Sequence, residues 1–378
     1  MTRKRRQIRF KIMVLILIFM LILGGVKLIK TAKSLLGYGA LDFQTIVTID
    51  YENEKNLIVL PFKEDMIIYN ENKLKRVTLA GEEKWKKEKV AKDPIMRTGG
   101  NLIFLANKET GQITAYDDGG NIVWEVDLKK SIGDFVCNKE GIIALYYENE
   151  ENSEIHIFNM EGKEAGKIRV DQGTIIDINI SDEEGNVAIS VMGIEKNKIE
   201  TNVALYAKEG KLLGGNTYTN QIISNVFFSD NNQIMCVGDK KLMVFSKEDA
   251  LLGSIDIPGD VNRVAWNQQG FIAMHLIDNR RTIIDTKNRN YIWIVEMEGK
   301  EESKIPIQGE VLGMDSKGEN VVAFTDRTLY FIFKKGKQLM EKKIHNDIQS
   351  VYMFSDNKLI LVLKNKIEIM QVKNKSKD

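Results

Sequence analysis

The chain has 378 residues, 43% of them hydrophobic and 28% charged, so it is long and apolar enough to bury a large core. The formal net charge is +1, but residues 1–33 hold nine Lys and Arg and no acid, which leaves 45 basic against 53 acidic residues, or −8, in the remainder. An acidic body behind a short basic tip argues against nucleic acid as a partner. Cys137 and Cys236 fall inside predicted strands, where we expect buried free thiols rather than a disulfide.

The N-terminal segment combines the basic tip with an apolar run. RKRRQIRFK precedes fifteen apolar residues, Ile12–Val26. A helix extended from Phe10 to Ile29 reaches the roughly 20 residues that span a bilayer. Because no small-x-small cleavage site follows, we expect an uncleaved transmembrane signal anchor, with a cleaved signal peptide as the alternative. Six basic residues before the span and three just after it predict a cytoplasmic N-terminus and an extracytoplasmic body.

The predicted division of the chain follows from this segment. It comprises a cytoplasmic tip at 1–11, the transmembrane anchor at 12–29, a linker at 30–42 and a β-propeller at 43–378. Phe43–Ile49 (FQTIVTI) is a predicted strand that belongs to no unit following it, whereas the last unit holds only three strands. We expect this strand to complete the last unit and to close the ring, because closure removes free sheet edges.

A hairpin phrase recurs from residue 56 to the end of the chain. In residues 111–128 (GQITAYDDGGNIVWEVDL), alternating apolar residues surround Asp-Asp-Gly-Gly, whose residues tolerate the positive φ of tight turns. The residue four before the turn glycine, or its stand-in, marks each unit. These marker residues are Val77, Tyr116, Phe158, Tyr206, Phe245, Val295, Ile332 and Met370. All-β units repeated eight times at roughly 40 residues predict an eight-bladed β-propeller, with seven blades as the alternative.

Polar side chains on the predicted inner strands form a candidate channel lining. They are Asp134, Asp177, Asn179, Asn225, Asn262, Arg263 and Asp315. Inner-strand side chains can face the central channel of a propeller and bind a ligand there, although a polar lining is also ordinary for the fold.

The insertion in the sixth unit, HLIDNRRTIIDTKNRN, is a candidate interaction loop. Its charged residues are Asp278, Arg280, Arg281, Lys287 and Arg289. This cationic cluster stands out on an acidic body, and Arg is favoured at interfaces because its planar fork makes bidentate bonds. Contact with anionic lipid head groups is a second possibility. The alternative is a solvated hairpin whose isoleucines pack onto the blade.

The sequence shows no pattern typical of catalysis or metal binding. His156, His275 and His345 fall in different units, and there is no HxH, HExxH or CxxC pair, nucleophile elbow or phosphate-binding glycine loop. The acidic turn at Asp117-Asp118 lacks the spacing of a calcium loop. We therefore expect no catalytic residue, cofactor or metal. The alternative is a glycan- or small-ligand-binding propeller, or an enzyme, that uses the channel mouth.

The segment Ala115-Tyr116-Asp117-x-x-Gly120-x-x-x-Trp124 resembles the repeat of quinoprotein-like eight-bladed propellers, and Gly81 with Trp85 repeats part of it. The whole plan is similar to an uncharacterised family of membrane-anchored, WD40-like propellers of low-GC Gram-positive bacteria. The resemblance implies the fold without redox activity, because the vicinal cysteines that hold the cofactor of quinoprotein dehydrogenases are missing. Similar propellers of bacterial envelopes act as scaffolds in protein-assembly machines, so it also implies an envelope scaffold that binds another envelope protein.

Overall fold

The computed structural model describes most of the chain. The described residues are 41–51, 57–88, 90–148, 152–246, 250–267, 270–278, 290–296, 301–333 and 339–374. Thr45–Gln371 forms one compact unit, and the terminal segments form another, of which Leu41–Gln44 and Val372–Asn374 are described. The predicted basic tip and transmembrane anchor lie outside the described residues. Within the described residues every regular element is a strand, and no helix is long and apolar enough to cross a membrane.

The strands form eight four-stranded sheets, the blades, which we number in chain order. Blade 1 contains β2 (Ile58–Phe62), β3 (Asp65–Asn70), β4 (Lys73–Thr78) and β5 (Glu83–Glu88). Blade 2 contains β6 (Pro94–Gly99), β7 (Leu102–Asn107), β8 (Gln112–Tyr116) and β9 (Ile122–Asp127). Blade 3 contains β10 (Asp134–Cys137), β11 (Ile143–Glu148), β12 (Ser153–Phe158) and β13 (Glu164–Val170). Blade 4 contains β14 (Thr174–Ile180), β15 (Val187–Glu195), β16 (Lys198–Tyr206) and β17 (Leu212–Thr219).

The second half of the chain repeats this plan. Blade 5 contains β18 (Ile223–Phe228), β19 (Ile234–Gly238), β20 (Lys241–Phe245) and β21 (Leu251–Asp256). Blade 6 contains β22 (Asp260–Asn267), β23 (Phe271–Ile277), β24 (Asn290–Glu296) and β25 (Glu301–Pro306). Blade 7 contains β26 (Gly313–Lys317), β27 (Asn320–Phe324), β28 (Thr328–Phe333) and β29 (Leu339–Lys343). Blade 8 contains β30 (Ile348–Ser355), β31 (Lys358–Leu363), β32 (Lys366–Asn374) and β1 (Leu41–Asp50).

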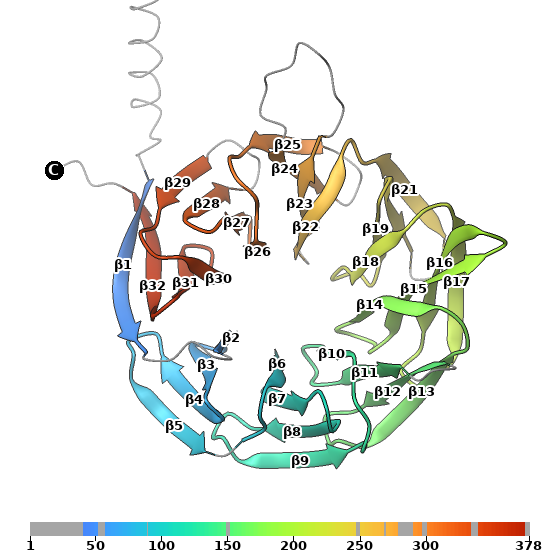
Figure 1. The fold of residues 1–378 in the computed structure, drawn as a ribbon, viewed down its shortest axis with the longest axis horizontal. Helices are drawn as coiled ribbons and strands as arrows, with labels where there is room; N and C mark the ends of the chain where they lie inside the picture. Colours follow the sequence, from blue (N-terminus) through green and yellow to red (C-terminus); the bar gives the residue numbers. More distant parts are fainter. Residues whose placement is uncertain are drawn as a thin grey trace, which may run out of the picture. The chain divides into compact units, whose positions relative to one another are not determined.

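The blades of the Thr45–Gln371 unit stand in a ring, with the first strand of each blade nearest the axis (Figure 1). Neighbouring strands pair antiparallel within a blade. Blade 8 is the exception in chain order, because its outer strand β1 comes from the other end of the sequence. The strand predicted over Phe43–Ile49 lies inside β1, which begins at Leu41. The chain therefore forms an eight-bladed β-propeller, as predicted, rather than one of seven blades.

The hairpin turns between the third and fourth strands have the predicted glycine geometry. Gly81, Gly120, Gly162 and Gly210 all have positive φ, between 74° and 90°. The N–H of Gly120 donates to the carbonyl of Asp117 at 3.1 Å, and the N–H of Asp117 donates to the carbonyl of Asn121 at 2.9 Å. A one-residue register shift follows each turn, as in three-residue hairpin loops closed by a glycine bulge.

The hydrophobic core lies between adjacent blades, and the marker residues face it. Tyr116 of blade 2 packs with Tyr69 and Leu74 of blade 1. Phe158 of blade 3 packs with Phe104 of blade 2, and Phe245, Val295 and Ile332 occupy the same place at later junctions. Burial of this apolar area, at about 25 cal/mol per Å², is the main term that holds the blades together.

Candidate functional site

The seven residues predicted to line the channel all lie on first strands of blades. Asp134 is on β10, Asp177 and Asn179 on β14, Asn225 on β18, Asn262 and Arg263 on β22, and Asp315 on β26. Simple alternation along the sequence does not reveal the β-bulges beside several of them. The register shifts between Ile175 and Asp177, between Ile223 and Asn225, and between Val261 and Arg263. A bulge re-aims the side chain beside it, which explains why these polar residues depart from simple alternation.

Most of these side chains bond to a neighbouring blade. The Asp177 carboxylate accepts from the N–H of Val226 in blade 5 at 2.8 Å. Asp315 accepts from the N–H of Met353 in blade 8 at 2.7 Å. In blade 6, Arg263 Nε donates to the carbonyl of Leu312 in blade 7 at 3.0 Å. These polar groups therefore tie blade 4 to blade 5, blade 6 to blade 7 and blade 7 to blade 8.

The remaining members make similar contacts. Arg97 Nη2 of blade 2 lies 3.1 Å from both carboxylate oxygens of Asp134 in blade 3. Asn262 Nδ2 lies 3.0 Å from His275 Nδ1 and donates weakly to the carbonyl of Val311 at 3.4 Å. Asn225 accepts from the hydroxyl of Ser224 at 3.1 Å, and Asn179 is half-buried.

We expect the Asp177→Asn variant to change how stability depends on pH. Desolvation raises the pKa of Asp177 from 3.8 to about 6, against hydrogen bonds that lower it. The folded state therefore binds this proton more tightly than the unfolded state, and the resulting stability is lost as pH rises from about 4 through about 6. Across that window the wild type should lose about 3 kcal/mol at most relative to the variant, as measured by urea unfolding. A difference that stays constant with pH would show that Asp177 is not desolvated.

A pocket of about 610 Å³ lies at the axis, where inner strands and turns of six blades contribute its lining. Pro61 comes from blade 1, Thr98 from blade 2, Lys139 from blade 3 and Lys317 from blade 7. Asp315 is the member of the predicted channel set that lines it. Lys139 is paired with Asp182 at 2.8 Å. We call this space the channel-mouth pocket.

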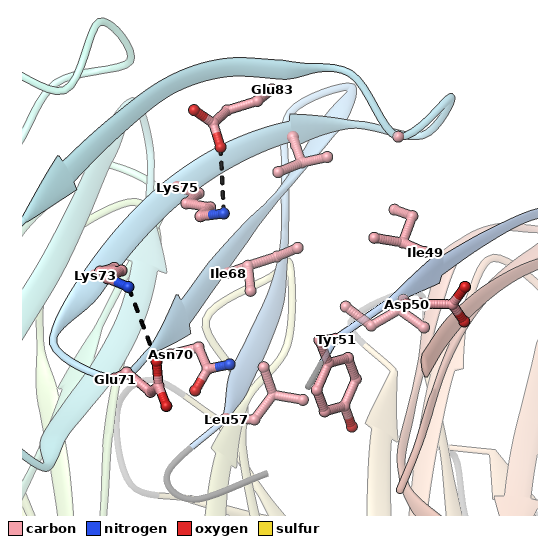
Figure 2. Close-up of a pocket in the computed structure, with 13 residues that line it drawn as sticks. Ile49, Asp50, Tyr51, Leu57, Ile68, Asn70, Glu71, Lys73, Lys75 and Glu83 are labelled. Carbon is pink, nitrogen blue, oxygen red and sulfur yellow. Dashed lines mark ion pairs between the residues drawn. The ribbon is translucent and has the colours of Figure 1, made fainter. Parts of the chain in front are cut away.

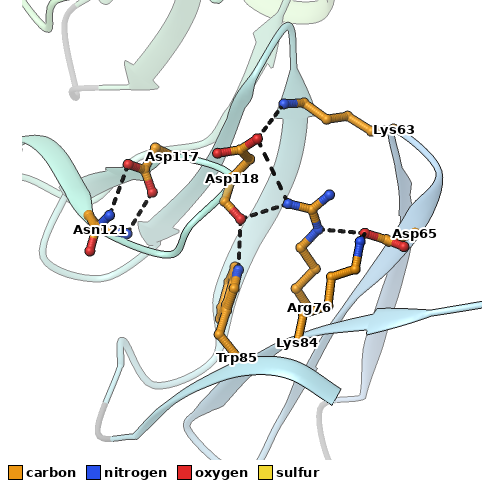
Figure 3. A network of polar contacts seen from close by, with 8 residues as sticks. All are labelled: Lys63, Asp65, Arg76, Lys84, Trp85, Asp117, Asp118 and Asn121. Atoms are coloured by element: carbon orange, nitrogen blue, oxygen red, sulfur yellow. Dashed lines mark hydrogen bonds and ion pairs between the residues drawn. The ribbon is translucent and has the colours of Figure 1, made fainter. Parts of the chain in front are cut away.

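A polar network joins blade 1 to the hairpin turn of blade 2 (Figure 3). Asp65, whose side chain is only 4% exposed, accepts from Arg76 Nε and from Lys84 Nζ, both at 2.7 Å. Arg76 Nη1 also donates to the backbone carbonyl of Asp118 at 2.7 Å, and Lys63 Nζ lies 2.8 Å from the Asp118 carboxylate. This salt bridge lowers the pKa of Asp118. Sequence reasoning missed Asp65 and Arg76, because an isolated Asp among charged residues gives no signal that it is buried.

Two tryptophans each contact the hairpin turn of the next blade. The Trp85 indole N–H donates to the carbonyl of Asp118 at 2.8 Å, and that of Trp124 to the carbonyl of Met160 at 3.0 Å. Each ring lies against a turn glycine: a Cβ placed on Gly120 would be 2.9 Å from Trp85, and one on Gly162 would be 2.6 Å from Trp124. Both tryptophans therefore pack between neighbouring blades.

A second pocket, of about 350 Å³, lies where the ring closes between blade 8 and blade 1 (Figure 2). Its apolar lining includes Ile49, Leu57, Ile68, Val77 and Ile367. Its polar residues are Asp50, Asn70, Glu71, Lys73, Lys75 and Glu83, and Tyr51 and Gly81 complete the wall. We call this space the closure pocket. The sequence contained only a weak signal for it. The marker residue is valine in blade 1 and aromatic in the next four blades, but it is again non-aromatic in blades 6 to 8.

The most polar cluster away from these pockets is built around His156 in blade 3. Its Nδ1 lies 2.7 Å from Glu164 and its Nε2 lies 3.1 Å from the hydroxyl of Tyr147. Glu154 accepts from that hydroxyl and pairs with Lys167 at 2.9 Å. Among the described residues, no group of three or more His, Cys, Asp and Glu side chains is arranged to hold a metal ion.

The other predicted features are placed as follows. Cys236 is a buried free thiol, and Cys137 is a half-buried one whose pKa burial raises to about 12. Of the candidate interaction loop, Asp278 is a described residue, whereas Arg280, Arg281, Lys287 and Arg289 lie outside the described residues.

The fold defines the class: the chain is an eight-bladed β-propeller. Within that class, it belongs to DUF5711, a family of unknown function whose model matches residues 40–372. No curated protein matches the sequence.

Several solved structures are similar in fold. BamB from Moraxella catarrhalis is 9% identical, with a TM-score of 0.57, and the match covers 87% of this chain and 100% of that one. The C-terminal WD40 domain of Sif2 is 12% identical, with a TM-score of 0.64 and coverage of 88% and 98%. BBS1N, solved in complex with ARL6DN, is 11% identical, with a TM-score of 0.50 and coverage of 88% and 97%. At these identities the likeness shows the fold alone.

Proposed function

We propose that this protein is a non-catalytic, membrane-anchored propeller that serves as a protein–protein interaction scaffold at the cell envelope. The observation that carries the proposal is that polar side chains on the inner strands bond to the protein itself. Asp177, Asp315 and Arg263 bond to the backbone of the next blade, so they hold a rigid ring. A rigid ring presents its loops in fixed positions, which suits recognition of another protein. The complex of BBS1N with ARL6DN supports a protein partner for a chain of this fold.

The proposed location in the cell comes from the N-terminal sequence. The apolar run Ile12–Val26 is preceded by six basic residues and followed by three, and no cleavage site follows it. This asymmetry supports an anchor with its N-terminus in the cytoplasm and a propeller outside the cytoplasmic membrane. The partner is then another envelope protein.

Binding of a glycan or a small ligand at the channel mouth is the second candidate function. The channel-mouth pocket, at about 610 Å³, falls within the usual size of ligand sites, and it presents Lys139 and Lys317. A small molecule retained by the purified protein would favour this function over the scaffold.

A membrane-impermeant crosslinker applied to intact cells tests the scaffold and its address together. We expect the propeller to be labelled without lysis and to capture a defined envelope protein, identified by mass spectrometry. Replacing Arg280, Arg281 and Arg289 with Ser should reduce capture at least several-fold, because charged side chains at an interface steer and orient partners. Labelling only after lysis would contradict the address, and labelling without capture of any protein would contradict the scaffold.

The control variant removes the same number of exposed cations elsewhere on the propeller. It replaces Lys163, Lys211 and Lys343 with Ser. Capture by this variant should equal that of the wild type. An equal loss in both variants would mean that net charge, and not the insertion in blade 6, governs capture.

A further inference from the structure

Blades 1 and 2, and likewise blades 2 and 3, meet in the same arrangement of two side chains. The marker residue of the later blade packs against the earlier blade. In return, a side chain on the outer strand of the earlier blade lies against the turn glycine of the later blade. Between blades 1 and 2 these residues are Tyr116 and Trp85. Between blades 2 and 3 they are Phe158 and Trp124. Aromatic rings fill both places at both junctions.

Where the ring closes, both places hold valine. The marker residue of blade 1 is Val77, which packs with Ile367 and Ile369 of blade 8. A Cβ placed on Gly81 would lie 3.4 Å from Ile49 and 3.7 Å from Val47, the two nearest side chains. The corresponding neighbours of Gly120 are Lys87 and Trp85, both at 2.9 Å. Val47 of β1 therefore stands where Trp85 stands on β5.

The closure pocket lies at this double replacement. Val77 and Gly81, the two reference points of the arrangement, both belong to its lining. Its wall is apolar on one side, at Ile49, Val77 and Ile367, and an apolar group that rests against this side would gain dispersion contacts there.

The charged residues at the rim of the closure pocket favour an uncharged ligand, such as an aromatic ring that carries a polar group at its edge. Lys75 Nζ lies 3.3 Å from Glu83, and Lys73 Nζ lies 3.8 Å from Glu71, so each ammonium group already faces a carboxylate (Figure 2). A charged ligand would have to displace one of these pairs. An indole or phenol ring can instead rest under a lysine, as the ring of Tyr147 does under Lys130 at 4.4 Å in blade 3.

We propose that the closure pocket binds an aromatic side chain of the partner protein, held as Trp85 and Tyr116 are held at the next junction. This inference rests on the scaffold function proposed above and identifies the place where the partner is gripped. An aromatic anchor buried in a pocket is typical of the residues that dominate the binding energy of protein interfaces.

The first test uses small probes on the full-length protein in lipid nanodiscs. Ligand-observed NMR should detect binding of N-acetyl-tryptophanamide and weaker binding of N-acetyl-leucinamide. Val77→Tyr and Val47→Trp, which copy the next junction, should each weaken tryptophanamide binding about tenfold or more, because the new ring occupies the pocket. Val123→Tyr, which adds a ring at an exposed position of β9, should leave binding unchanged.

The two pocket-filling variants also report on folding. Each should raise the thermal midpoint, because it fills a void with apolar volume that the fold accepts at the next junction. If one variant fails to fold, the other still supplies the comparison. Equal affinity for tryptophanamide and leucinamide, or unchanged affinity in a folded pocket-filling variant, would overturn the inference.

Crosslinking in intact cells separates this inference from the scaffold function. Loss of capture in Val77→Tyr and Val47→Trp, with capture kept in Val123→Tyr, supports the pocket as the partner's site. Equal capture in all three variants would overturn the pocket while leaving the scaffold function standing. If the wild type captures no protein, the scaffold function is wrong. Binding of tryptophanamide would then not be evidence that a protein partner occupies the pocket.

Discussion

A protein truncated to begin at Tyr51 will lose the cooperative unfolding of the intact propeller, whereas one that begins at Leu41 will keep it. The difference is the strand β1, which pairs with β32 on the outside of blade 8. Without it, β32 becomes an open edge with unpaired backbone groups, and Val47 and Ile49 no longer cover the apolar cluster of blades 8 and 1. Val47 and Ile49 are half-buried, so each contributes less than the about 1.5–3 kcal/mol of a fully buried aliphatic side chain. The loss of this burial adds to the loss of the backbone pairing between β1 and β32.

Calorimetry and circular dichroism of the two truncated proteins measure this effect. The protein beginning at Leu41 should melt in one transition. The shorter protein should melt broadly and at lower temperature, with a tendency to aggregate through its open edge. Equal midpoints and equal unfolding enthalpies would show that β1 is dispensable for the ring.

Asp65→Ala should destabilise the propeller by about 3–5 kcal/mol, because it leaves the Arg76 guanidinium buried without its carboxylate. The Asp65 side chain is 4% exposed and that of Arg76 is 11% exposed, so water cannot replace the lost partner. Arg76 also holds the Asp118 carbonyl, and loosening it should weaken the contact between blades 1 and 2. Chemical unfolding monitored by fluorescence is suitable, since Trp85 bonds to the same carbonyl.

Asp171→Ala is the matched control for this measurement. Asp171 pairs with Arg169 at 2.7 Å, the same distance as Asp65 with Arg76, but its side chain is 76% exposed and that of Arg169 is 63% exposed. An exposed pair contributes about 0–1 kcal/mol. Similar losses in the two variants would mean that burial does not distinguish the two ion pairs.

The sequence predicts the fold well because the residues that indicate a blade lie close together in the chain. The turn glycine at Gly120, the marker Tyr116 and the tryptophan four residues after the glycine all lie within ten residues of one another, and the phrase repeats. The outer strand of blade 8 was also predictable, because Phe43–Ile49 had no other blade to join. Sequence period and turn chemistry are sufficient for features of this kind.

The candidate sites were less predictable, because they depend on contacts between residues far apart in the chain. Nothing beside Asp177 indicates that its carboxylate accepts from Val226, 49 residues away. The closure pocket is harder still, since Val47 and Val77 are ordinary strand residues until the ring brings them together. Its signal is a missing aromatic ring, which becomes visible only when the junctions are compared with one another.

The pairing of β1 with β32 also constrains when the protein can fold. Thr45 donates to Glu368, 323 residues later, so the first strand made must wait for the last. During synthesis blades 1 to 7 can form in turn as they emerge, but the ring stays open until the final strand is released. Such long-range pairing slows folding, because the chain loses the conformational entropy of closing a very large loop before the stabilising contacts between the two strands can form. Until β32 is made, β1 has no partner strand, and in that interval a chaperone that shields exposed strands would have its largest effect on folding.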